Sequence, residues 1–131
     1  MTQEELMVGD LVMFNNGVDK VQEIYGKVGN VYLQEYGTIE ISRLSPIFLT
    51  EEILEKIGFV RFYVNYVNYW KMQVDNSYIE LRPTEGNMAI WLDYDKDNDG
   101  IYANYILPYP DNLHQLQHAL RLCGIEKEID L

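Results

Sequence analysis

The hexapeptide Asp95-Lys96-Asp97-Asn98-Asp99-Gly100 carries the oxygen ligands with which a calcium-binding loop begins. Asp95, Asp97 and Asp99 would supply side-chain oxygens at loop positions 1, 3 and 5, and the glycine at position 6 permits the sharp turn. The twelfth position should hold a bidentate glutamate, but this chain has Ile106 there. Because the flanking residues have strand character, we interpret the segment as a β-hairpin tip, with weak calcium binding by the three aspartates as the alternative.

Two histidines, His114 and His118, stand four residues apart in a segment of helical periodicity, a spacing that metal-binding pairs use. Relative to the apolar stripe of that helix, they are predicted to project toward solvent near Arg121. No Cys, Asp or Glu lies one turn away to complete a coordination set, and no Ser or Cys is placed beside them as a nucleophile. We therefore interpret the pair as exposed helix surface and expect no metal there.

The single cysteine, Cys123, excludes an intrachain disulfide and is expected to be a buried structural thiol. The sequence contains no phosphate-binding glycine loop, zinc motif or nucleophile elbow. We therefore expect no enzymatic activity, no catalytic residue and no cofactor. The segment 1–5 is acidic and lacks the apolar core of a secretory signal, and no apolar run approaches the roughly 18 residues of a membrane span. A cytoplasmic location without membrane insertion is expected.

The chain is strongly acidic, with 21 Asp and Glu against 10 Lys and Arg and a formal net charge of −11. A field of this sign repels phosphate backbones, and the basic residues are scattered singly along the sequence. Direct nucleic-acid binding is therefore not expected. The acidity leaves open an indirect role, in which the chain imitates nucleic acid and occupies the binding sites of other proteins.

Eleven tyrosines are many for 131 residues, and they are dense between Phe59 and Trp70. If this stretch were one strand, Tyr66 and Trp70 would lie on one face, and Tyr63 and Tyr69 on the other. Aromatic side chains on a sheet can anchor a partner protein. We name Tyr63, Tyr66, Tyr69 and Trp70 as candidates for a partner surface. The alternative is a sheet covered on one side, with tyrosine hydroxyls at its rim.

The remaining elements follow from periodicity and turn signals. Residues 6–44 contain four or five short strand-like runs, one of which ends at the turn signal Asn15-Asn16-Gly17. A helix is predicted over 50–57, capped by Thr50 and ended by Gly58. Residues 59–107 read as four strands in two hairpins. A last helix over 111–123 begins at the capping residue Asp111 and buries one stripe, formed by Leu113, Leu116, Leu120 and Cys123.

These elements predict an α+β fold: a small SH3-like N-terminal β-barrel, a helix, an antiparallel β-meander and a C-terminal helix. We expect residues 1–45 to form the barrel subdomain. Residues 46–131 are expected to combine the helix, the sheet and the C-terminal helix, with the whole chain as one compact unit.

Three segments also resemble a known pattern. Residues 45–59, SPIFLTEEILEKIGF, resemble the "PIPLTEEILLKNGF" segment of an uncharacterised family of small proteins from Bacteroidetes genomes, prophages and mobile elements. Residues 112–120 resemble the closing "VHQLQNLYFALTG" helix of that family, and residues 7–12 resemble its opening strand. The order of the three agrees, although Phe48 and Leu122-Cys123 depart from the pattern. The resemblance implies an SH3-like N-terminal barrel and a phage or mobile-element origin, with no catalytic residue to carry over.

The function expected from these features is a non-enzymatic protein-interaction module whose partner is another protein. An acidic nucleic-acid decoy, a calcium-dependent binder and a weak hydrolase are the alternatives. Exposed strand edges also leave self-association into a homo-oligomer open.

Overall fold

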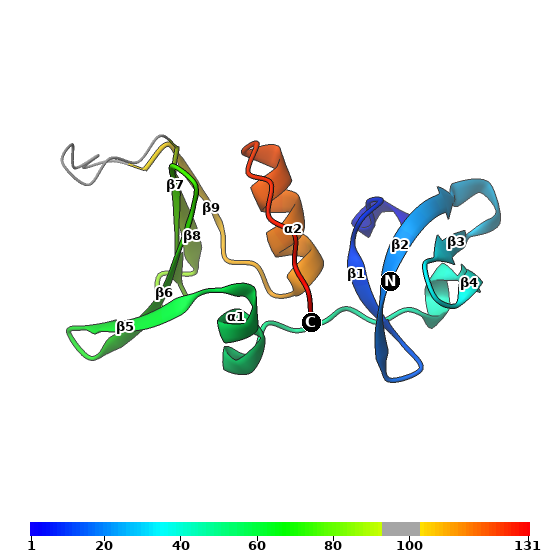
Figure 1. Cartoon of the computed structure of the whole chain (residues 1–131), viewed down its shortest axis with the longest axis horizontal. Coiled ribbons are helices and arrows are strands. Elements are labelled where there is room, and N and C mark those ends of the chain that lie inside the picture. Colours follow the sequence, from blue (N-terminus) through cyan, green and yellow to red (C-terminus); the bar gives the residue numbers. More distant parts are fainter. Residues whose placement is uncertain (93–102) are drawn as a thin grey trace. The chain divides into compact units, whose positions relative to one another are not determined.

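The computed structural model describes residues 1–92 and 103–131 (Figure 1). It contains two antiparallel sheets and two α-helices, which confirms the predicted α+β class. The chain packs as two compact units. The first consists of Met1–Phe48 and Asp111–His118, and the second of Leu49–Pro110 and Ala119–Leu131.

The first unit contains a four-stranded antiparallel sheet in the order β1-β2-β3-β4. Asn15 and Asn16 connect the first two strands with φ of 50° and 63°, the left-handed values that a two-residue hairpin turn requires. The Asn-Gly signal therefore predicts this turn correctly. The strands are β1 (Leu11–Phe14), β2 (Gly17–Tyr25), β3 (Asn30–Leu33) and β4 (Gly37–Glu40), and the 3-10 turns are η1 (Gln3–Glu5), η2 (Gly26–Val28) and η3 (Ile41–Arg43).

Within the described residues this sheet does not close into a barrel. β1 and β4 are its two edges, and β1 makes one additional bridge, between Met13 and Ser45. The predicted barrel subdomain is therefore observed as an open sheet that curves around a small core. That core is formed by Leu6, Val12, Phe14, Val21, Val31, Leu33, Ile41 and Leu44.

A buried carboxylate fixes the turn between β3 and β4. Asp19, in β2, is only 3% exposed and accepts backbone N–H bonds from Glu35 and Tyr36 at 3.0 to 3.1 Å, and from Lys20 at 2.8 Å. These charge-assisted bonds offset the cost of burying the carboxylate. They also satisfy the backbone N–H groups of Glu35 and Tyr36 in the turn. Tyr36 is thereby held edge-on against Phe14, with ring centroids 4.9 Å apart.

The second unit contains α1 and a five-stranded meander in the order β5-β6-β7-β8-β9. The N–H of Ile53 donates to Thr50 Oγ1 at 3.3 Å, and Gly58 ends the helix with φ of 121°. Both termini of the predicted helix are therefore confirmed. The elements are α1 (Glu51–Ile57), β5 (Val60–Val64), β6 (Val67–Val74), β7 (Ser77–Arg82), β8 (Asn87–Trp91) and β9 (Tyr105–Pro108).

The stretch from Phe59 to Trp70 is two strands instead of the one that the sequence indicates. Asn65 and Tyr66 have φ of 50° and 65° and form a tight turn between β5 and β6. The predicted two faces of a single strand are therefore wrong, because the chain reverses direction at the turn. The meander consequently has five strands instead of four. One face of this sheet carries the buried side chains Trp70, Met72, Ile79, Leu81, Met88 and Ile90.

The capping residue of the last helix, α2 (Leu113–Leu122), lies one position later than predicted. The N–H of Gln115 donates to Asn112 Oδ1 at 3.0 Å, so Asn112 caps this helix and Asp111 does not. The predicted buried stripe of Leu113, Leu116, Leu120 and Cys123 is confirmed. No helix in the described parts of the chain combines the length and the apolar character needed to cross a bilayer.

The cap of α1 can be tested by substitution. Thr50→Ala removes the acceptor of the Ile53 N–H, and we expect the free energy of unfolding to fall by about 1 kcal/mol in a urea titration. Thr50→Asp should retain most of the stability, because a carboxylate at a helix N-terminus is favourable. Thr84→Ala, in the exposed turn after β7, is the matched control. An equal loss in the control would contradict a capping role.

Candidate functional site

The tip of the β5–β6 hairpin carries two exposed aromatic side chains. Tyr66 is 91% exposed and Tyr63 is 61% exposed. Their rings meet edge to face, with centroids 6.4 Å apart. A tyrosine with positive φ is uncommon. The two rings form an exposed aromatic projection at the end of the hairpin.

The stem of the hairpin is held by aromatic pairing across its two strands. Phe62 and Tyr69 are direct partners in the register, and their rings stack at 5.3 Å. Lys71 Nζ lies 5.2 Å from the centre of the Phe62 ring, at cation–π distance. The Tyr69 hydroxyl donates to Glu85 at 2.7 Å, and this hydrogen bond raises the pKa of Tyr69. Such cross-strand pairs stabilise the pairing of β5 with β6.

The four predicted partner-surface residues have different positions. Tyr63 and Tyr66 are exposed, and Tyr69 is half-buried beside Glu85. Trp70 is only 4% exposed, so its assignment to a partner surface is wrong. The turn at residues 65–66 causes the difference, because it places Trp70 opposite Leu81 on the core face of the sheet.

Sequence reasoning also missed two exposed valines. Val60 is 60% exposed and Val64 is 46% exposed, and both belong to β5, the edge strand of the sheet. Together with Tyr63 and Tyr66 they form what we call the hairpin surface. An open hollow of about 500 Å³ lies beside it, lined by Arg61, Phe62, Tyr63 and Asn68. The signal that could have revealed it is Asn65, a residue that favours left-handed backbone.

The calcium-loop candidates Asp95, Asp97 and Asp99 lie outside the described residues. Among residues 1–92 and 103–131, no group of three or more His, Cys, Asp or Glu side chains is arranged to hold a metal ion.

The histidine pair does not lie on an exposed helix surface, which corrects the prediction. His114 is 2% exposed, and His118 Nε2 lies 2.7 Å from Asp10 Oδ2. Asp10 itself has no exposed surface and accepts the Met7 N–H at 2.8 Å. The prediction failed because it assumed that α2 buries only its apolar stripe. The polar side of its first turns packs against the start of β1 instead, 108 positions earlier in the chain.

A glutamine completes this polar contact. Gln117 accepts the Leu11 N–H at 3.0 Å through Oε1 and donates to the Gly9 carbonyl at 3.2 Å through Nε2. One polar cluster therefore joins the start of β1 to α2, and it is formed by Asp10, His114, Gln117 and His118. Burial lowers the pKa of His114, and the nearby Asp10 carboxylate partly opposes this effect. His114 Nδ1 has no hydrogen-bond partner among the described residues, so the neutral ring is the form that this site accommodates.

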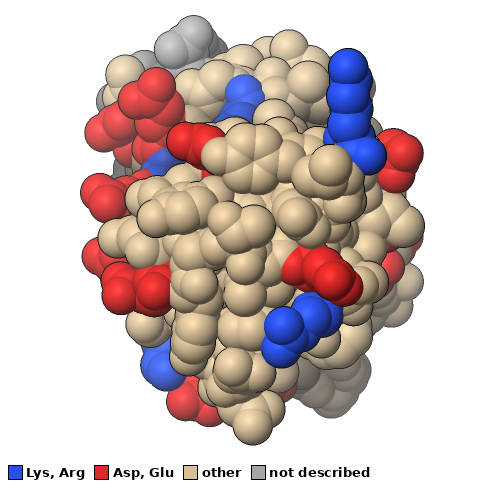
Figure 2. Space-filling view, turned by 90° about the vertical axis from the view of Figure 1, so that its right-hand side faces the viewer, with Lys and Arg blue, Asp and Glu red and all other residues tan. Residues whose placement is uncertain are grey.

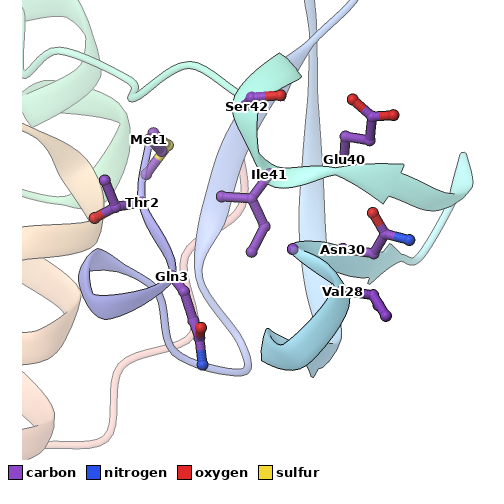
Figure 3. A pocket seen from close by; sticks show the side chains of 9 residues that line it. Met1, Thr2, Gln3, Val28, Asn30, Glu40, Ile41 and Ser42 are labelled. Atoms are coloured by element: carbon purple, nitrogen blue, oxygen red, sulfur yellow. The ribbon is translucent and has the colours of Figure 1, made fainter.

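A second open hollow, of about 510 Å³, lies at the N-terminus of the first unit. Figure 3 shows Met1 and Gln3 on one side of it and Val28 and Glu40 on the other, with Ile41 between them. The Gln3 side chain occupies the space that a Cβ at position 26 would need. Glu40 carries the one charged side chain among the residues lining the hollow.

Figure 2 views the molecule from the side on which β1–β4 lie in Figure 1. Most of this face is uncharged, with one acidic and one basic side chain next to each other below and to the right of its centre. Acidic side chains gather along its left margin, and the Lys and Arg side chains are separated from one another. On this face there is no basic patch that would accept a phosphate backbone.

Comparison with protein-family models, with curated protein sequences and with solved structures finds no match to this chain.

The buried histidine makes the stability dependent on pH. Burial lowers the pKa of His114 in the folded chain, whereas in the unfolded chain the ring binds a proton near its ordinary pKa of 6.5. The neutral ring therefore makes its full contribution to the free energy of unfolding above about pH 7.5. This contribution is lost as the pH falls through 6.5 toward the lowered pKa of the folded chain. His114→Leu should flatten the unfolding free energy between about pH 7.5 and 5.5, measured by urea titration at each pH. An unchanged slope would contradict a buried neutral ring.

The bond between Asp10 and His118 can be measured with a double-mutant cycle. We expect Asp10→Asn and His118→Gln to be coupled by about 2 kcal/mol at pH 7, because the buried carboxylate loses a charge-assisted bond in either variant. The control cycle combines Asp111→Asn with His118→Gln, since Asp111 is exposed. Coupling of equal size in both cycles would argue against a specific bond.

Proposed function

We propose that this chain is a non-enzymatic protein-interaction module that docks a partner protein through the hairpin surface of β5 and β6. The observation that carries the proposal is the exposure of Tyr66, 91%, in the tight turn at the tip of the hairpin. Val60, Tyr63 and Val64 extend the apolar surface from the tip along the edge strand.

Two physical properties of this surface favour docking: its apolar side chains are exposed to water, and the hairpin that carries them is already folded. Tyrosine is enriched among the residues that dominate binding energy, because it combines a large apolar ring with a polar end. The stacked Phe62 and Tyr69 and the Asn65-Tyr66 turn hold the surface in one conformation. A partner would therefore not have to supply the free energy of ordering it.

The charge distribution supports the same surface. No Asp or Glu occurs from Lys56 to Val74, although the whole chain carries a net charge of −11. Interface cores are depleted in carboxylates, since each one must be desolvated when the partner binds. The two strands of the hairpin thus carry no carboxylate of their own, and the two that reach them, Glu51 and Glu85, are paired with Arg61 and the Tyr69 hydroxyl.

The first unit bears on the fold and the origin of the proposed module. We propose that its open four-stranded sheet, with the additional bridge between Met13 and Ser45, is a variant of the SH3-like barrel. Together with the resemblance of residues 45–59 and 112–120 to small proteins of prophages and mobile elements, it supports a module of such origin that works in the cytoplasm without a cofactor.

The proposal can be tested with a substitution that leaves the turn intact. Tyr66→Gly removes the ring and creates an Asn-Gly pair, which favours the same tight turn. Proteins captured from the native host by the immobilised wild type should bind the variant at least about tenfold more weakly, the effect expected for an interface hot spot. Tyr25→Ser, which removes an exposed ring from the first unit, is the matched control.

Two outcomes would contradict this function. Equal capture by the wild type and Tyr66→Gly would exclude the hairpin surface as the docking site. Captured proteins that DNA displaces equally well from both, with strong salt dependence, would instead identify the chain as an acidic decoy.

A further inference from the structure

β5 is an edge strand whose outer side is unpaired. It pairs with β6 on one side only, and no other strand within residues 1–92 and 103–131 pairs with its opposite side. All five of its residues, Val60 to Val64, are exposed or half-buried. A flat edge of β-branched and aromatic residues, without proline or a bulge, is a template on which another strand can add.

The register shows which backbone groups are free. Val64 and Val67 flank the tight turn, so the hydrogen bond across the turn joins this pair. In an antiparallel ladder the bonded pairs alternate, which directs the N–H and C=O groups of Val60, Phe62 and Val64 toward β6. The N–H and C=O groups of Arg61 and Tyr63 therefore point outward, and these four groups are the ones an added strand would bind.

We propose that the occupant of this edge is a second copy of the chain, paired β5 to β5 in antiparallel orientation about a two-fold axis at Phe62. The inference rests on the proposed role of the hairpin and names its partner and its geometry. Val-Arg-Phe-Tyr-Val is close to a palindrome, so this register places Val60 opposite Val64 and Arg61 opposite Tyr63 of the second copy. The outward groups of Arg61 and Tyr63 then bind each other, in four backbone hydrogen bonds.

The side chains in this register are complementary on both faces. On one face each Arg61 lies beside a Tyr63 ring, a favourable cation–aromatic pair. The two Arg61 residues are displaced from one another by two positions, about 7 Å along the strand, so like charges are not opposed. On the other face Val60, Phe62 and Val64 meet their counterparts in an apolar row.

The charge of the chain favours this edge over other surfaces for self-association. Two copies with a net charge of −11 repel one another wherever carboxylates face each other. The segment from Lys56 to Val74 contains no carboxylate and three basic residues, and Glu51, which lies 3.9 Å from Arg61, is offset by that guanidinium, so the local repulsion is small. Its five-residue strand makes a small interface, which corresponds to a weak, concentration-dependent dimer.

The dimer is tested by sedimentation velocity across a concentration series. The wild type should shift from monomer toward dimer between about 10 µM and 1 mM, the range of a small interface. Tyr63→Glu should associate at least as strongly, because the new carboxylate lies opposite Arg61 of the second copy. The double variant Arg61→Glu with Tyr63→Glu should associate about tenfold more weakly, since the register then opposes like charges.

Cysteine cross-linking tests the register itself. Residues 60 and 64 of two copies would lie about 4.5 Å apart between Cα atoms, within the range of a disulfide. An oxidised mixture of Val60→Cys and Val64→Cys chains should therefore form a covalent dimer. Each variant alone should not, because identical positions lie about 14 Å apart in this register. Cys123 does not interfere, since it is buried and its burial raises the pKa of its thiol.

The outcomes separate this inference from the proposed function. A chain that remains monomeric at every concentration, with no cross-link in the mixture, would overturn the β5 pairing. If such a monomer still bound a partner that Tyr66→Gly lost, the interaction module would stand without self-pairing. A cross-linked dimer that captured no other protein would support the pairing and would restrict the partner of the hairpin surface to a second copy of the chain.

Discussion

The first unit depends on the burial of one carboxylate. Asp10 has no exposed surface, and its desolvation is compensated by the Met7 N–H and by the ring of His118. Because a buried charge without partners would cost several kcal/mol, the start of β1 and the first turns of α2 are bound to each other. The same contact, 2.7 Å between Asp10 Oδ2 and His118 Nε2, orients the ring of His118 within the first unit.

A second constraint is the backbone conformation of the tight turn that forms the tip of the hairpin surface. Tight turns need residues with positive φ, and Asn65 and Tyr66 both adopt it. The turn converts what reads as one aromatic strand into a hairpin with one ring at its tip and another against it. Exposure, edge position and the absence of carboxylates then coincide in β5, so that docking and self-pairing follow from one local feature.

Local signals in the sequence predicted local structure well. The capping threonine Thr50, the glycine Gly58 and the asparagine turn at 15–16 each involve neighbours within four positions, and all are found as expected. The errors concern position and pairing. The exposure of His114 depended on a carboxylate 104 residues away, and the burial of Trp70 depended on a turn whose second residue is a tyrosine. Neither feature can be recognised from the periodicity of the sequence, because a buried polar pair or an unusual turn does not repeat along the chain.

The assignment of residues to the two units has a consequence for the order of synthesis. The sheet of the first unit is complete at residue 48, but its remaining part, Asp111–His118, lies near the C-terminus. A nascent chain therefore holds Asp10 without its histidine until the whole second sheet has been translated. Domains usually fold from the N-terminus as they emerge. Here the first unit is incomplete until α2, which follows the second sheet in the sequence, has been made.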